Sequence, residues 1–156
     1  MLSKESLARI DREIAKYPPD RRQSAVLAAL TAAQDEHGWL SEPLMDYVAE
    51  LLGMRPIQVY EVATFYSMYE LKPVARHKIS VCTNVACMLC GSDEIVAHLK
   101  RKLGIGFGET TADGRFTLKE VECLAACGGA PMFMVDKTYY ENLTPGRVDE
   151  ILDKLD

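Results

Sequence analysis

The chain has 156 residues, enough for one ordinary domain or two small ones. Hydrophobic residues make up 48% of it and charged residues 26%, which excludes a disordered chain and is typical of a globular one. The formal net charge is −5, and neither half on either side of Ala75 has a positive excess, so we expect neither nucleic acid nor an anionic membrane as a partner. No apolar run approaches the roughly 20 residues of a membrane-spanning helix, so we expect no direct membrane insertion.

The first 75 residues predict a small helical bundle, which we expect to be a domain of its own. Apolar residues recur three and four positions apart in four stretches, and prolines or glycines separate these stretches. Helices joined by such short connections are typical of a bundle. The expected helices cover residues 7–17, 21–36, 42–52 and 56–71.

Residues 76–156 predict a second domain of α/β type. Alternating apolar and polar residues indicate strands, and capping residues followed by helical spacing indicate helices. The expected order is β-α-β-β-α, in which helices cover a sheet, so the whole chain is expected to be of the α+β or α/β class. The expected strands cover residues 77–82, 115–121, 132–135 and 137–141, and the expected helices cover 92–103 and 145–155.

All five cysteines lie in this second half, between Cys82 and Cys127. The first residues lack the basic start and apolar stretch of a signal peptide and are too acidic for a transit peptide, so we expect a reducing, cytoplasmic compartment. Because five is an odd number, a framework made only of disulfides would leave one cysteine unpaired. The cysteines are therefore expected to be ligands or nucleophiles.

Four of the cysteines form two pairs, Cys82-x4-Cys87 and Cys123-x3-Cys127, and each pair begins where a predicted strand ends. Two loops at the same edge of a sheet can bring four thiolates together without distorting either element. Four thiolates suit a tetrahedral zinc ion or a [2Fe–2S] cluster, and the spacings exclude neither. A structural zinc module therefore stays open as a second hypothesis.

Cys90 allows two further interpretations. Together with Cys82 and Cys87 it reproduces the C-x4-C-x2-C spacing of plant-type ferredoxins, but that fold would leave Cys123 or Cys127 without a role. With Cys87 it also forms the C-x-x-C of a thiol oxidoreductase, which would leave three cysteines without a role. We prefer the two-plus-two arrangement, with Cys90 as a small buried hydrophobe or a lone thiol.

With these cysteine motifs the sequence resembles a known family, the thioredoxin-like [2Fe–2S] ferredoxins that serve as the E subunit of NADH:quinone oxidoreductase, respiratory complex I. The resemblance spans nearly the whole chain, including the helical N-terminal part. The segments that carry it are Glu61-Val-Ala-Thr-Phe-Tyr66, Val81-Cys-Thr-Asn-Val-Ala-Cys-Met-Leu89, Gly108-Glu-Thr-Thr111, Val121-Glu-Cys-Leu-Ala-Ala-Cys-Gly-Gly-Ala-Pro-Met132 and the pair Tyr139-Tyr140 before Leu143-Thr144.

The resemblance implies one [2Fe–2S] cluster per chain, held by Cys82, Cys87, Cys123 and Cys127, with Cys90 outside the ligand set. It implies a one-electron-transfer subunit that accepts an electron from FMN on a partner flavoprotein subunit, which also binds NADH. Other subunits of the peripheral arm would be further partners, and the chain would sit on the cytoplasmic side of the inner membrane through the complex. Related subunits of NAD-linked hydrogenases and formate dehydrogenases are the alternative within this class.

Other features are expected to be structural. The scattered His37, His77 and His98 argue against a Rieske-type cluster with two histidine ligands, and no G-x-G-x-x-G or P-loop offers a nucleotide site on this chain. Pro131 is a candidate for a cis peptide bond, and Gly128-Gly129 for either a close approach to the cluster or a plain turn. The large side chains Tyr60, Phe65, Tyr66, Met68 and Tyr69 are expected in the core, with a docking face for the flavoprotein as the alternative.

Overall fold

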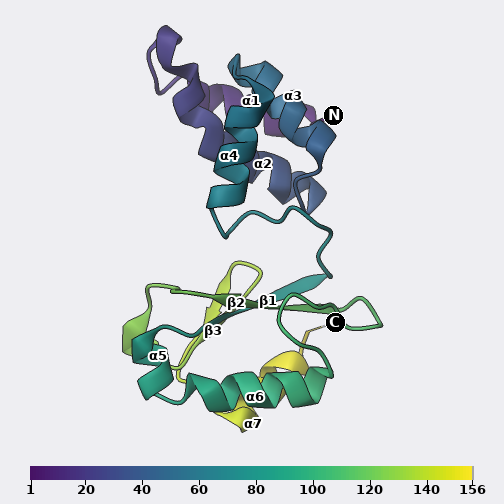
Figure 1. Cartoon of the computed structure of the whole chain (residues 1–156), viewed down its shortest axis with the longest axis vertical. Coiled ribbons are helices and arrows are strands. Elements are labelled where there is room, and N and C mark those ends of the chain that lie inside the picture. The colour runs from purple at the N-terminus through teal and green to yellow at the C-terminus, as the bar shows by residue number, and fades with distance from the viewer. Residues whose placement is uncertain (156) are drawn as a thin grey trace. The chain divides into compact units, whose positions relative to one another are not determined.

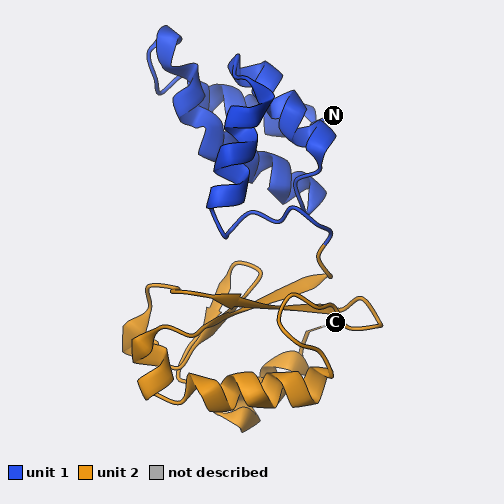
Figure 2. Cartoon of the chain, viewed as in Figure 1, with its two compact units in different colours: residues 1–73 blue, residues 74–156 orange. Residues whose placement is uncertain are grey.

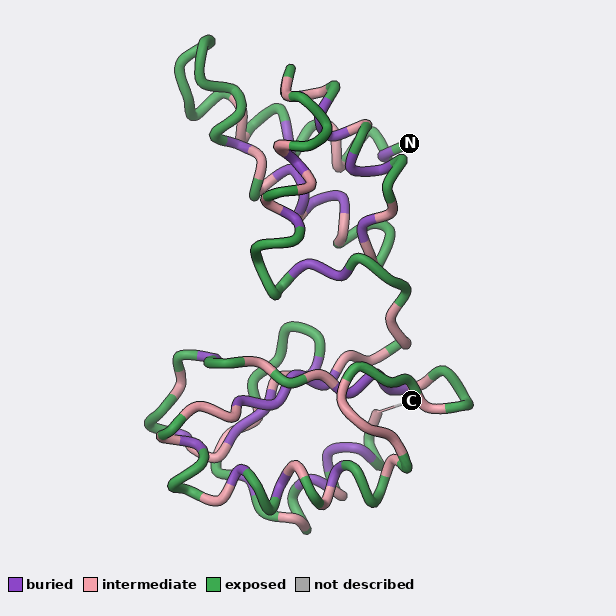
Figure 3. The backbone as a smooth tube through the Cα atoms, viewed as in Figure 1, coloured by how far each residue is buried: buried purple, intermediate pink, exposed green. Residues whose placement is uncertain are grey.

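The computed structural model describes residues 1–155, and the chain forms two compact units, Met1–Pro73 and Val74–Asp156 (Figure 2). The first unit is the expected bundle, with a buried core of mainly Ala, Leu and Val side chains (Figure 3). Its elements are α1 (Lys4–Ile14), the 3-10 helix η1 (Pro19–Ala25), α2 (Val26–His37), α3 (Glu42–Leu52) and α4 (Pro56–Phe65) (Figure 1).

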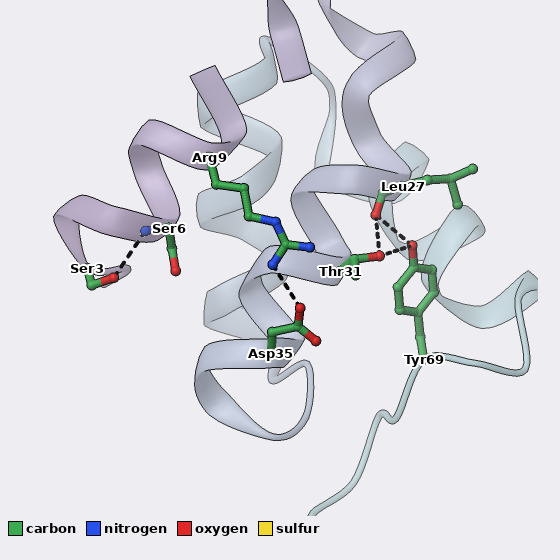
Figure 4. Close-up of polar contacts among 7 residues, drawn as sticks. All are labelled: Ser3, Ser6, Arg9, Leu27, Thr31, Asp35 and Tyr69. Atoms are coloured by element: carbon green, nitrogen blue, oxygen red, sulfur yellow. Dashed lines mark hydrogen bonds and ion pairs between the residues drawn. The ribbon is translucent and has the colours of Figure 1, made fainter. Parts of the chain in front are cut away.

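Polar contacts fix the start of α1 and its place against α2 (Figure 4). The Ser3 hydroxyl accepts a hydrogen bond from the Ser6 N–H at 3.2 Å, which satisfies one free N–H of the first turn. Arg9 reaches across to Asp35 of α2, with 2.8 Å between guanidinium nitrogen and carboxylate oxygen. The expected start of the second helix at residue 21 was wrong, because the backbone at Arg21 is not helical and a 3-10 segment precedes Val26.

The fourth helix ends at Phe65 rather than near residue 71. Hydrogen bonds to α2 and to the turn after it hold the following segment in another conformation. The Gln34 side chain accepts from the Glu70 N–H at 2.6 Å and donates to the Met68 carbonyl at 3.0 Å, and the Leu40 N–H donates to the Glu70 carbonyl at 2.7 Å. These contacts satisfy the backbone groups that a longer helix would have paired internally.

The early end of α4 changes which of the large side chains in and after this helix are buried. Tyr69 is buried as expected, and its hydroxyl donates to the Leu27 carbonyl at 2.8 Å (Figure 4). The expectation of a core position was wrong for Phe65, Tyr66 and Met68, which are exposed; the Phe65 side chain is 79% accessible.

The second unit is a four-stranded mixed sheet in the order β2-β1-β3-β4, with α6 and α7 on one face (Figure 1). Strands β1 and β2 are parallel, whereas β3 is antiparallel to both β1 and β4. Buried aliphatic and aromatic residues of the sheet and of both helices form its core. This arrangement confirms the expected fold class. The elements are β1 (His77–Cys82), α5 (Val85–Leu89), α6 (Ser92–Leu103), β2 (Phe116–Val121), the 3-10 turn η2 (Cys127–Gly129), β3 (Phe133–Val135), β4 (Thr138–Tyr140) and α7 (Pro145–Leu152).

Two local features differ from expectation. Helix α5 was not predicted, because its five residues are too few for a periodic pattern, so Cys87 lies on a short helix rather than in a loop. Ser92 was expected to cap α6, but Gly91 occupies that position with a left-handed φ of 93°, and Ser92 is the first helical residue. The Ser92 side chain is 1% exposed, and its hydroxyl has no hydrogen-bond partner within residues 1–155.

Candidate metal centre

The parallel pairing of β1 with β2 places the two cysteine pairs at the same edge of the sheet. Cys82 is the last residue of β1 and stands opposite Val121, the last residue of β2. The chain leaves both strands at this edge, into α5 with Cys87 on one side and into the segment from Cys123 to Cys127 on the other. Figure 1 shows α5 beside the sheet where β1 ends.

Thiols of the two pairs influence one another's pKa values. The side chains of Cys87, its neighbour along the chain, and of Cys123, in the second pair, lower the pKa of Cys82. Cys87 in turn interacts electrostatically with Cys127. All four are free cysteines, and the parallel register of β1 and β2 places both pairs at the same edge of the sheet.

Burial raises the pKa values of the Cys82 and Cys87 thiols, whereas neighbouring backbone N–H groups lower them. Burial raises the pKa of Cys82, but N–H groups of Asn84 and Leu124 and the neighbouring thiols outweigh it, so that this pKa lies below its ordinary value. Burial, the Cys82 side chain and its charge raise the pKa of Cys87 to about 11. A metal centre bound here would supply the positive charge that stabilises the thiolate forms.

Backbone N–H groups interact with three of the four sulfurs, those of Cys82, Cys87 and Cys123. Asn84 and Leu124 direct theirs at Cys82, and Met132 directs its own at Cys87. The Ala125 N–H donates to the Cys123 sulfur, with 3.3 Å between nitrogen and sulfur. Such N–H···S contacts offset the negative charge of a metal–thiolate group, so the donor set fits a [2Fe–2S] cluster.

The second cysteine segment has a constrained backbone. Ala125 adopts a left-handed φ of 57°, which is uncommon for a residue with a Cβ atom. The Tyr139 hydroxyl of β4 donates to the Leu124 carbonyl at 3.0 Å, and the Ala130–Pro131 peptide bond is cis. Sequence reasoning missed Tyr139 as part of this site, because nothing in the sequence indicates a contact between it and Leu124.

The two glycines after Cys127 have different surroundings. Gly129 lies against the Glu141 side chain, where an added Cβ would come within 2.6 Å of that residue's Cβ and Cγ atoms. A Cβ at Gly128 would meet nothing within 4 Å. The close approach at Gly129 is therefore to Glu141 of the same unit, as part of the turn η2.

Cys90 lies apart from this set of contacts. It ends α5, and its N–H donates to the carbonyls of Ala86 and Cys87. The expectation that it is a small buried hydrophobe was wrong, because Cys90 is exposed. Of the two interpretations of Cys90, its exposure favours the lone thiol.

The three histidines pair with carboxylates outside this region. The distances are 3.8 Å from His37 to Glu36, 2.9 Å from His77 to Asp136 and 2.8 Å from His98 to Asp149. In residues 1–155, no group of three or more His, Cys, Asp or Glu side chains is arranged to hold a single metal ion. A [2Fe–2S] cluster takes two protein ligands on each of two irons, so its ligands need not converge on one point.

A mixed sheet with helices on one face and two cysteine pairs at one edge defines a thioredoxin-like protein with a thiolate site. The chain matches the thioredoxin-like [2Fe–2S] ferredoxin family over residues 10–156 and belongs to that family. The resemblance noted in the sequence is thereby confirmed, and membership of this family implies an iron–sulfur cluster.

Curated relatives match over nearly the whole chain. The E subunit of NADH-quinone oxidoreductase from Rickettsia bellii is 47% identical over 153 residues, which cover 97% of this chain and 92% of the relative. An E subunit of the same enzyme from Rhizobium meliloti is 48% identical over 144 residues, covering 92% and 84%. NADH dehydrogenase [ubiquinone] flavoprotein 2 of Dictyostelium discoideum is 44% identical over 154 residues, covering 98% and 62%.

A solved structure of similar fold is an NAD+-reducing [NiFe]-hydrogenase in the air-oxidized state. The TM-score is 0.69 at 22% identity, and the match covers 81% of this chain and 22% of the hydrogenase chain. This likeness shows the fold alone. Among the residues that the structure describes, no helix is both long and apolar enough to cross a bilayer.

Proposed function

We propose that this chain is the one-electron-transfer subunit of an NADH:quinone oxidoreductase, holding one [2Fe–2S] cluster. The observation that carries the proposal is the parallel register of β1 and β2, which ends with Cys82 opposite Val121 and so places both cysteine pairs at one edge of the sheet. Family membership and the names of relatives at 43–48% identity support the same conclusion.

We propose Cys82, Cys87, Cys123 and Cys127 as the four ligands. When bound, the cluster would take up and release a single electron, with no proton or group transfer by the protein. The chain's own contribution is to bury the sulfurs of Cys82 and Cys87, to offset thiolate charge with N–H donors, and to leave Cys123 and Cys127 exposed. The exposed pair gives a redox partner access to one side of the site.

The surface beside the site supports a protein partner. Val85, Met88 and Leu89 are exposed apolar residues of α5, the helix that carries Cys87. A cluster of large apolar side chains at the surface marks an interaction site. We propose that it binds the flavoprotein subunit, which carries FMN and NADH, and that further peripheral-arm subunits hold this chain at the cytoplasmic side of the inner membrane.

Serine replacements in the full chain test the ligand set. Cys82→Ser, Cys87→Ser, Cys123→Ser and Cys127→Ser are each expected to lose or alter the visible absorption and the EPR signal of the reduced protein. Cys90→Ser is the matched control and is expected to keep both. A normal spectrum in any of the four variants, or its loss in the Cys90 variant, would contradict this assignment.

Reduction by NADH tests the electron donor. NADH is expected to reduce the cluster when the FMN-containing flavoprotein subunit is bound and to leave the isolated chain oxidised. Leu89→Gln is expected to weaken that complex about tenfold, whereas Arg101→Gln, on the exposed side of α6, leaves it unchanged. Reduction of the isolated chain by NADH would contradict the proposed electron donor. Equal binding by both variants would contradict the proposed partner surface.

Metal analysis distinguishes the other hypotheses. A structural zinc module would yield a colourless protein with one zinc per chain. A subunit of an NAD-linked hydrogenase or formate dehydrogenase would hold the same cluster but would purify with different partners. The 47% identity to the E subunit of NADH-quinone oxidoreductase from Rickettsia bellii supports the quinone-reducing complex.

A further inference from the structure

The Tyr139 hydroxyl is joined to the Cys123 sulfur through a single peptide unit. Its oxygen donates to the Leu124 carbonyl at 3.0 Å, and the N–H of that same peptide, which belongs to Ala125, donates to the Cys123 sulfur at 3.3 Å. The chain of contacts therefore runs from hydroxyl to carbonyl, through the peptide plane, and from N–H to sulfur. Hydrogen bonds linked in this way polarise and strengthen one another.

The conformation of this peptide unit is not one that Ala125 prefers. Its left-handed φ of 57° places the Cβ atom close to the following carbonyl, which is unfavourable for a residue other than glycine. A conformation of this kind persists only where its surroundings hold it. The hydrogen bond from Tyr139 is such a restraint, because it fixes the carbonyl end of the same peptide.

Tyr139 is itself held firmly enough to act in this way. It is the central residue of β4 and stands opposite Met134 of β3, which in turn stands opposite Ser80 of β1. The ring is 50% exposed, yet its hydroxyl is bonded to a carbonyl of the nearly buried Leu124. A side chain from the edge of the sheet thus reaches over to the segment that carries Cys123.

We infer that Tyr139 is a positioning residue, which holds the Leu124–Ala125 peptide so that the Ala125 N–H points at the Cys123 sulfur and raises the reduction potential of the cluster. This inference rests on the proposed function, because it needs Cys123 as a ligand. N–H···S bonds stabilise the more negative, reduced state, so losing one makes reduction less favourable. Tyr139 acts through the peptide and does not touch the reacting group.

Tyr139→Phe in the full, cluster-loaded chain tests the inference, because it removes only the hydroxyl. We expect unchanged iron and sulfide content and an equilibrium shifted about threefold to tenfold toward the oxidised form. That shift is roughly 30–60 mV more negative for a one-electron couple, measured in an EPR-monitored redox titration. In D2O-exchanged samples, the coupling of an exchangeable proton near the reduced cluster should also change.

Tyr140→Phe is the matched control, since its ring packs on Phe133 with 5.7 Å between centroids and it lies one residue away. Its potential is expected to equal that of the wild type. A second pair of variants, Ala125→Gly with and without Tyr139→Phe, guards against failure of the loop to form, because glycine adopts the left-handed conformation without steric cost. Of these two variants, the one that keeps the Tyr139 hydroxyl is expected to have the higher reduction potential.

Equal potentials for wild type and Tyr139→Phe, with the cluster present in both, would overturn this inference and leave the proposed function standing. A wild-type chain without a [2Fe–2S] cluster would overturn both.

Discussion

Cys82 and Val121 stand opposite each other as the last paired residues of the parallel strands β1 and β2. Because the strands are parallel, the chain leaves both at one edge of the sheet, and the segment from Cys123 begins beside Cys82. An antiparallel pairing of the same strands would have sent the two cysteine pairs to opposite edges. The register of β1 and β2 is therefore what assembles the candidate metal centre.

Gly129 and Gly128 provide a matched pair of substitutions in the turn after Cys127. Gly129→Ala is expected to destabilise the protein by about 1–3 kcal/mol, because the new Cβ overlaps the Glu141 side chain. Gly128→Ala adds a methyl group where no atom beyond the two neighbouring residues lies within 4 Å, and it should leave the thermal midpoint unchanged. Equal midpoints for the two variants would contradict this account of the turn.

The Tyr69 hydroxyl contributes to the stability of the helical bundle. Tyr69→Phe leaves the ring in place but removes the bond to the Leu27 carbonyl, with an expected loss of about 1 kcal/mol in denaturant unfolding. Tyr66→Phe changes an exposed ring and should shift the free energy of unfolding by less than about 0.5 kcal/mol. If both variants were equally stable, the buried hydroxyl would have no structural role.

Two buried hydroxyls in the second unit are expected to behave in opposite ways. Ser92→Ala removes an oxygen without a partner in residues 1–155, so stability should stay the same or rise by about 1 kcal/mol. Thr117→Val removes an oxygen that accepts from the Ala75 N–H at 2.8 Å, so stability should fall by about 1–3 kcal/mol. A substantial loss in Ser92→Ala would reveal a partner for that hydroxyl.

Glu36 makes the bundle sensitive to acid. Hydrogen bonds from Ser6 and Ser3 hold its carboxyl pKa below the ordinary value of 4.5, against a smaller effect of burial. A pKa lowered in the folded state contributes stability above pH 4.5, and this stability is lost as the pH falls through the lowered value.

Ser3→Ala removes the hydroxyl contact of Ser3 with Glu36 and tests its effect directly. The pKa of Glu36, followed by carboxyl NMR titration, is expected to move up toward its ordinary value, and acid unfolding should begin from a less stable state. Ser24→Ala, which removes an exposed hydroxyl of η1, is the control and should leave the titration unchanged. An identical Glu36 titration in both variants would refute the assignment.

Much of the fold could be predicted because its signals are local. The alternation of Ile79 and Val81 between polar residues marks β1, and Thr144-Pro145 marks the start of α7. The end of α4 could not be predicted, because hydrogen bonds to Gln34 and Leu40, which are distant in the sequence, decide it. The five residues of α5 are likewise too few to show a period.

Some features of the candidate site could likewise be predicted from the sequence, and others could not. The spacing of the cysteines and their positions after strands pointed to all four proposed ligands. The N–H donors of Leu124 and Ala125 and the hydroxyl of Tyr139 could not be found, because backbone direction and contacts across the sheet leave no pattern in the sequence. One of the two interpretations of Cys90, a small buried hydrophobe, was wrong for a similar reason, since the exposed end of α5 was not foreseen.

The iron, acid-labile sulfide and zinc content of the full chain, purified without oxygen and without added metal, tests whether four of its cysteines hold a [2Fe–2S] cluster. We expect two irons and two sulfides per chain, with an EPR signal that appears only after reduction. One zinc per chain, with neither iron nor sulfide, would contradict this expectation.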